Sequence, residues 1–276
     1  MKKIITVLII LFLCGETLLS QDLTQPQKNK NFFEIDVSGG FCLPVMDLRG
    51  SDGLLGFYNF YNYGMSSGFG TTINTKMSVY TTKMTQLKIY LILGYSHFST
   101  DDNTAYQVGV AQYGWPKETG TSHTPFVPVQ TGGTSYLRLN MPNIAFGLEY
   151  SVFTDRKCRS AFNFGGDLTV HDITGRAYDD VNGLGETYNT IAASLRFGFG
   201  VNVAYSYKFD NYVGFHVGTR FTMPNMFGKS SEITDDPGYI SLLDKGNAIL
   251  NPLLSSGRSM GYFNFFGGMS FYIGKK

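Results

Sequence analysis

The chain has 276 residues and a formal net charge of +1, and only 16% of its residues are charged. This near neutrality gives no electrostatic basis for binding nucleic acid, so that class of partner is excluded. The 33 glycines, 23 phenylalanines and 18 tyrosines favour strands and tight turns over solvated helices.

The N-terminus has the pattern of an export signal. Lys2 and Lys3 provide a charged start, residues 4–13 an apolar core, and residues 15–20 a more polar exit, which predicts a signal peptide over 1–20. Residues 21–31 are rich in Gln, Asn and Lys and predict a short periplasmic lead-in. We expect the remaining residues, 32–276, to form one domain.

The first predicted strand shows the pattern that defines this domain. Over residues 33–41, Phe33, Ile35 and Val37 fall on one face, whereas Glu34 and Asp36 fall on the other. A soluble sandwich rarely buries two carboxylates on one face, because burial without water or a basic partner is costly. The lumen of a membrane barrel supplies either of these, so the alternation favours a barrel strand.

Similar alternation recurs along the chain. It predicts seven further strands, at about 68–79, 87–95, 135–153, 162–171, 191–203, 212–221 and 260–273. In the fourth of these eight strands the apolar parity changes near Pro142, which predicts a β-bulge there. In the sixth strand we place Ile191 on the outward face.

The connections alternate between long and short. Long loops are expected over 43–67, 99–134, 172–187 and 222–259, and the other connections are turns of a few residues. Aromatic residues gather at the predicted strand ends, with Phe98 and Tyr262 among those at the outer ends, as in the aromatic girdles of membrane barrels. The fold class predicted is all-β, an eight-stranded antiparallel transmembrane β-barrel with long extracellular loops and short periplasmic turns. Its predicted location is the outer membrane of a Gram-negative cell, with outer-membrane lipid as its surroundings.

The aromatic-rich last strand, Tyr262 to Ile273, together with this architecture, carries a resemblance. The mature chain resembles the small outer-membrane barrels of the OmpA-transmembrane, OmpX and PorT-like type. The resemblance is to an architecture, and it implies a small outer-membrane barrel. The sequence departs from that pattern by continuing past the expected aromatic terminus with Gly274, Lys275 and Lys276.

Charged side chains collect on the predicted inner face. An eight-stranded barrel has an interior just wide enough for side chains, so these charges are expected to pair and plug the lumen. A narrow ion path or gated channel is the alternative. The predicted lumen network comprises Glu34, Asp36, Lys76, Lys88, Asp167, Arg196, His216 and Arg220.

Aromatic residues of the first two loops are the candidates for surface binding. Phe57, Tyr58 and Tyr61 lie in the Gly-rich first loop, and Trp115 lies in the long second loop. Such side chains stack on sugars or grip a protein partner. A rim that contacts the membrane, or a packed loop, is the alternative.

One constellation suggests an enzyme. His97 and Ser99 lie two residues apart on one face, and an imidazole beside a hydroxyl is the arrangement that activates a nucleophile. The stretch His97-Phe98-Ser99 resembles the His-x-Ser of outer-membrane lipid A deacylases, which implies hydrolysis at the outer leaflet. Thr100 stands where that family has Asn, and the acid would have to be Asp101, Asp102 or a loop residue, none of which is singled out by spacing.

No metal-site spacing occurs among the four histidines and the mature cysteines, so neither a metal nor a cofactor is expected. Cys42 and Cys158 fall at opposite ends of the predicted barrel and should be free thiols. We therefore predict a non-enzymatic outer-membrane protein with a structural or surface-interaction role through its extracellular loops. The alternatives are an outer-leaflet hydrolase using Ser99 and His97, and an accessory subunit of a secretion or transport complex.

Overall fold

The computed structural model describes residues 33–49, 64–100, 133–181, 187–229, 239–240, 242, 244 and 258–274. The predicted signal peptide and lead-in lie outside the described residues. Within these ranges, no helix is long and apolar enough to cross a membrane.

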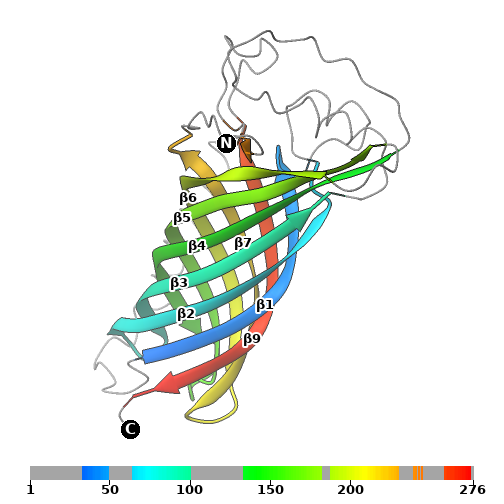
Figure 1. Ribbon diagram of the computed structural model, residues 1–276. Coiled ribbons are helices and arrows are strands. Elements are labelled where there is room, and N and C mark those ends of the chain that lie inside the picture. Colours follow the sequence, from blue (N-terminus) through cyan, green and yellow to red (C-terminus); the bar gives the residue numbers. More distant parts are fainter. Residues whose placement is uncertain are drawn as a thin grey trace, which may run out of the picture.

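Eight long strands form the fold and close on themselves (Figure 1). Each pairs antiparallel with its neighbours, and the first pairs with the last over 14 residue pairs, from Phe33 with Ile273 to Met46 with Met260. A ninth, two-residue strand pairs parallel with β6. The strands are β1 (Phe33–Met46), β2 (Ser67–Thr81), β3 (Thr85–Ser99), β4 (Gly133–Phe153), β5 (Ser160–Val181), β6 (Thr187–Lys208), β7 (Val213–Phe227), β8 (Tyr239–Ile240) and β9 (Met260–Ile273).

The outer surface of the barrel is apolar. Phe146, Leu168 and Leu195 expose 59%, 74% and 60% of their surface, and large apolar side chains face outward on all eight long strands. Exposing so large an apolar surface to water is unfavourable, whereas contact with lipid hydrocarbon is not. Because closure also pairs the backbone of every long strand, the barrel meets the two conditions for spanning a bilayer with strands. The protein is an all-β, eight-stranded outer-membrane barrel, as its sequence predicts.

Several strands are longer than predicted at the ends that carry the long loops. β5 extends to Val181 and β6 begins at Thr187, so the prediction of a loop over 172–187 is wrong. β1 and β7 likewise continue to Met46 and Phe227. Outward polar residues such as Thr174 and Arg176 indicate a loop when the sequence is taken alone, because lipid excludes them. A strand that rises above the bilayer has water on that face and tolerates them.

The bulge predicted at Pro142 is also absent. The pairing of β3 with β4 runs without a shift from Ser99–Arg138 to Thr85–Val152, and β4 keeps one register with β5 on both sides of Pro142. The parity therefore never changes: Leu137, Leu139 and Met141 point inward. The prediction failed because it assumed that apolar side chains must face lipid.

Two further placements on the outward face are wrong for related reasons. Phe98 and Tyr262, predicted in the outer aromatic girdle, point inward, with ring centroids 5.1 Å apart. Ile191 is fully buried inside the barrel rather than outward, because a one-residue register shift between β5 and β6 lies between Ile173 and Gly175. A shift of one residue turns a side chain to the other face.

The turns at the opposite end are short and internally bonded. After β6, the backbone N–H groups of Tyr212 and Val213 each donate to Asp210 Oδ1 over 2.7 Å, and these bonds lower the pKa of the Asp210 carboxyl. This turn and the C-terminal end of β9 lie at the same end of the barrel (Figure 1). Within the described ranges neither Cys42 nor Cys158 forms a disulfide bond, as predicted.

Candidate functional site

The inward side chains of the strands fill the lumen with charge. All eight predicted network residues are buried, with exposed fractions of 1–7%. They do not form one group: the structure brings them together in two clusters inside the barrel and one ion pair near the mouth, and adds partners that sequence reasoning missed.

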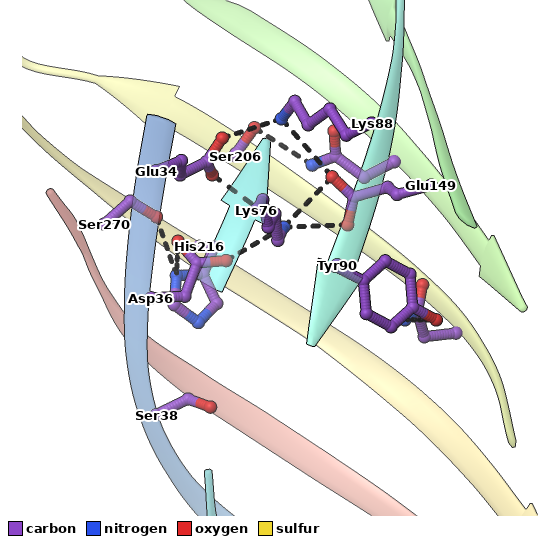
Figure 2. A network of polar contacts seen from close by, with 12 residues as sticks. Glu34, Asp36, Ser38, Lys76, Lys88, Tyr90, Glu149, Ser206, His216 and Ser270 are labelled. Carbon is purple, nitrogen blue, oxygen red and sulfur yellow. Dashed lines mark hydrogen bonds and ion pairs between the residues drawn. The ribbon is translucent and has the colours of Figure 1, made fainter. Parts of the chain in front are cut away.

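The largest cluster surrounds two lysines (Figure 2). It lies toward the short turns, since Lys88 is three residues from the start of β3. Lys76 Nζ on β2 lies 2.8 Å from Asp36 Oδ2 and 2.7 Å from Glu149 Oε2. Lys88 Nζ on β3 donates to Glu34 Oε2 over 2.7 Å and lies 3.3 Å from Glu149 Oε1. Glu149 on β4 therefore links both lysines. Charges this deeply buried are tolerated only when they are paired in this way.

His216 joins this cluster from β7. Its Nδ1 lies 2.9 Å from the Ser270 hydroxyl and 3.8 Å from Asp36 Oδ1. Figure 2 shows the ring directed toward Asp36 and Ser270. The cluster thus takes side chains from β1, β2, β3, β4, β7 and β9, and it ties together strands that are remote in sequence.

A second cluster lies further along the lumen. Arg220 on β7 donates to Asp167 Oδ1 on β5 over 2.7 Å, and the Tyr90 hydroxyl donates to Asp167 Oδ2 over 2.8 Å. Gly200 makes room for this pair: a Cβ at that position would lie 2.6 Å from Asp167 Oδ1 and 2.8 Å from Arg220 Nε. The glycine is therefore required by the packing of the ion pair.

The third charged group is an ion pair near the mouth. Arg196 on β6 makes two parallel bonds to Asp244, from Nε to Oδ2 over 2.7 Å and from Nη2 to Oδ1 over 2.8 Å. Both side chains are almost fully buried. Asn225 Nδ2 also donates to Asp244 Oδ2 over 3.2 Å. Because Asp244 belongs to the connection between β7 and β9, this pair fastens that connection inside the barrel.

An apolar cluster closes the same end of the lumen. Its members come from the inward faces of the strands and from two of the connections, and all are at most 2% exposed. They are Cys42, Leu48, Met65, Phe98, Leu137, Leu139, Met141, Ile173, Ile191, Leu242, Met260 and Tyr262. Leu242 lies two residues from Asp244, so one segment supplies both the ion pair and part of the apolar closure.

Little space is left between the charged clusters. The cavity among Glu34, Asp36, Lys76, Arg220 and Asn264 has a volume of about 40 Å³. Three amide oxygens in this region, those of Asn163, Asn202 and Asn264, have no hydrogen-bond partner among the described residues. A space of this size holds at most a few waters.

His97 and Ser99 both lie on the outward face at the outer end of β3, half-exposed. His97 Nδ1 contacts Asn140 Oδ1 over 2.8 Å, and the Tyr95 hydroxyl donates to the same oxygen over 2.6 Å. Among the described residues, no hydrogen bond joins His97 to Ser99 and no carboxylate contacts His97. Asp101 and Asp102 lie outside the described residues, as do the loop candidates Phe57, Tyr58, Tyr61 and Trp115.

Sequence reasoning missed several partners in the lumen, among them Glu149, Tyr90 and Asp244. Glu149 could have been found, since it alternates with the outward Leu148 and Tyr150. Tyr90 also alternates, but an aromatic residue gives no sign that its hydroxyl will bind Asp167. Asp244 carried no signal, because nothing in a loop sequence tells which residue folds into the barrel. Within the described residues, no group of three or more His, Cys, Asp or Glu side chains is placed to hold a metal ion.

No protein-family model matches the chain, and no curated protein matches it. Among solved structures, the chain is similar to Neisserial surface protein A, at 10% identity over 87% of this chain and 97% of that one, with a TM-score of 0.37. It is also similar to Ail, the attachment invasion locus protein of Yersinia pestis, at 6% identity over 87% and 99%, with a TM-score of 0.33.

A third similar structure is the outer membrane protease OmpT from Escherichia coli, at 10% identity over 91% of this chain and 99% of that one, with a TM-score of 0.40. These likenesses are low and carry no argument about activity. The placement of the protein in the outer membrane rests on its closed strands and its apolar exterior.

Proposed function

We propose that this protein is a non-conducting component of the outer membrane that acts as a scaffold or through surface interactions of its extracellular loops. The observation that carries the proposal is the double closure of the lumen. Paired charges fill one half, and an apolar cluster with a buried ion pair fills the other. Because side chains fill both halves of the lumen, the outer surface and the extracellular loops are the parts of the protein that can contact partners.

The loops remain the proposed contact surface. Two of the long connections, those after β1 and β3, carry Phe57, Tyr58, Tyr61 and Trp115. Aromatic side chains of this kind are enriched where proteins bind partners. A protein or a glycan is the proposed partner, and an accessory place in a secretion or transport complex is compatible with the same surface.

The filled lumen predicts that the protein does not conduct ions. Purified protein reconstituted in planar bilayers is expected to give no discrete conductance steps, because the cavity among the charged residues is only about 40 Å³ and ions do not cross an apolar constriction without water. A porin reconstituted in parallel provides the positive control. Discrete steps from the wild type that disappear when the protein is unfolded by heat would overturn the proposal.

The geometry at Ser99 does not favour the hydrolase. Asn140, an amide rather than a carboxylate, is the residue that contacts His97 Nδ1, and an amide cannot stabilise an imidazolium as an acid does. Cells that express the wild type, Ser99→Ala or no protein are therefore expected to have identical outer-membrane lipids by mass spectrometry. Loss of an acyl chain with the wild type alone would make this protein an enzyme.

A further inference from the structure

The ion pair at the mouth joins donors on the barrel wall to an acceptor on a connection. Arg196 and Asn225 belong to the long strands β6 and β7, whereas Asp244 lies between β8 and β9. Arg196 Nη1 also donates to the Leu195 carbonyl over 2.9 Å, and the Met260 N–H donates to Asn225 Oδ1 over 2.8 Å. These bonds orient both donors without help from Asp244. The barrel wall therefore carries a preformed carboxylate site, and the connection supplies the carboxylate that fills it.

The same segment also supplies an apolar group. Leu242 is fully buried and belongs to the apolar cluster that closes this end of the lumen. The Cα atoms of Leu242 and Asp244 can be at most about 7 Å apart, because they are two residues apart in the chain. A mostly apolar pocket with a few fixed polar groups is the usual composition of a small-molecule site. The segment thus fills the mouth as an amphipathic carboxylate would.

A buried side chain beside this site has no described partner. His171 on β5 is the direct cross-strand neighbour of Arg196, and it is fully buried. Neither of its ring nitrogens has a hydrogen-bond partner among the described residues, and the same holds for Oδ1 of its other cross-strand neighbour, Asn143. Leaving a buried polar group unpaired is costly. The row next to the Arg196 guanidinium therefore offers hydrogen bonds to a ligand that, unlike Asp244, is not tethered to the chain.

The described backbone contacts of this segment are short. β8, which precedes Leu242, pairs with β6 over two residue pairs, and the Arg258 N–H donates to the Asp244 carbonyl over 2.8 Å. Segments held by little backbone pairing open at a lower free energy than the strands of the core. A ligand can therefore exchange with Leu242 and Asp244 while the barrel stays folded.

We propose that the mouth of the lumen is a binding site for a monocarboxylate with an apolar chain of medium length, and that Leu242 and Asp244 occupy it when the ligand is absent. The ligand carboxylate accepts the bonds of Arg196 and Asn225 and a further bond from His171. Its chain takes the place of Leu242 in the apolar cluster. The inference goes beyond the proposed function and leaves it intact, because the two charged clusters still fill the rest of the lumen when the segment is displaced.

Limited proteolysis of the folded wild type in detergent micelles tests the proposal, with octanoate, octanol or acetate as the added probe. Octanoate is expected to speed cleavage within residues 228–259 by about tenfold at saturation, because it displaces the segment and cleavage follows the population of the open form. Octanol lacks the carboxylate and acetate lacks the chain, so neither should speed cleavage. The barrel strands should remain uncut with every probe.

Matched variants separate a specific site from a general effect of octanoate on the micelle. Arg196→Met with Asp244→Leu replaces the ion pair by an apolar pair that keeps the segment in place, so octanoate should not change its cleavage. His171→Leu removes hydrogen bonds that the closed state does not use among the described residues. Its cleavage without a probe should equal that of the wild type, whereas its response should need about tenfold more octanoate, the usual effect of losing a hydrogen bond to a charged group.

Asp244→Ala provides an independent measurement of the same site. Octanoate is expected to bind this variant about tenfold more tightly than the wild type, since a competing segment no longer lowers the fraction of protein that is open to the ligand. Affinity is measured by equilibrium dialysis of labelled octanoate at equal micelle concentrations. The gel mobility of unheated protein checks that each variant is folded.

The proposal fails on any of three results. Equal acceleration of cleavage by octanoate and octanol would show that no carboxylate is recognised. Acceleration that persists in the variant with Arg196→Met and Asp244→Leu would show that octanoate acts through the micelle. Equal octanoate affinity of the wild type and Asp244→Ala would show that Asp244 and octanoate do not compete for one site.

Discussion

Lys76→Met is expected to lower the free energy of unfolding by about 3–5 kcal/mol, the usual effect of removing one partner from a buried ion pair. Lys76 Nζ lies 2.8 Å from Asp36 and 2.7 Å from Glu149. Methionine keeps the length of the side chain and removes the charge. Lys88 would then be the single lysine left in the cluster beside three carboxylates that the barrel keeps out of water.

Stability is measured as the midpoint of urea unfolding of the barrel in detergent micelles. The gel mobility of unheated samples reports the folded fraction at each urea concentration. Lys157→Met, in an exposed turn, is the control and should change stability by no more than about 0.5 kcal/mol. Adding Glu149→Leu to Lys76→Met should recover part of the loss, because the two residues are coupled. A loss for Lys76→Met as small as that of the control would mean that water solvates this cluster and that the lumen is not plugged by paired charge.

Asp244→Ala is expected to release the connection between β7 and β9 from the mouth of the barrel. Arg196 would lose both of its bonds to a carboxylate while almost fully buried, a cost of about 3–5 kcal/mol if the segment stayed in place. If the segment around Asp244 detaches, water can solvate the Arg196 guanidinium and this cost is avoided. We therefore expect the segment to detach. Leu242 would leave with it and open the apolar closure.

Limited proteolysis of the folded barrel measures this release. Cleavage within residues 228–259 should be faster in Asp244→Ala by about tenfold or more, since proteolysis follows the population of the open segment. The barrel strands should remain intact. Asp172→Ala, on the exterior, is the control. Arg196→Met combined with Asp244→Leu should restore protection, because an apolar pair of similar volume replaces a buried ion pair well. Unchanged cleavage in Asp244→Ala would show that the ion pair does not hold the segment.

Alternation made the strands of this protein predictable. The side chains of Phe33, Ile35 and Val37 must face opposite to those of Glu34 and Asp36 in any extended backbone, so the presence of a strand and the polarity of its two faces are local properties. The same logic placed the eight predicted charged residues on the inner face, where the structure also has them. It erred at Leu137, Leu139 and Met141, where apolar side chains face inward instead.

The sequence by itself determined the number of long strands and the inward position of the eight network residues, because both depend on residues close in the chain. The tertiary structure decided the partners. Lys76 binds Glu149, 73 positions away, and Arg196 binds Asp244 from a connection, since closure and register bring those side chains together. Alternation specifies which face a residue occupies, whereas only the closed barrel specifies what it meets there.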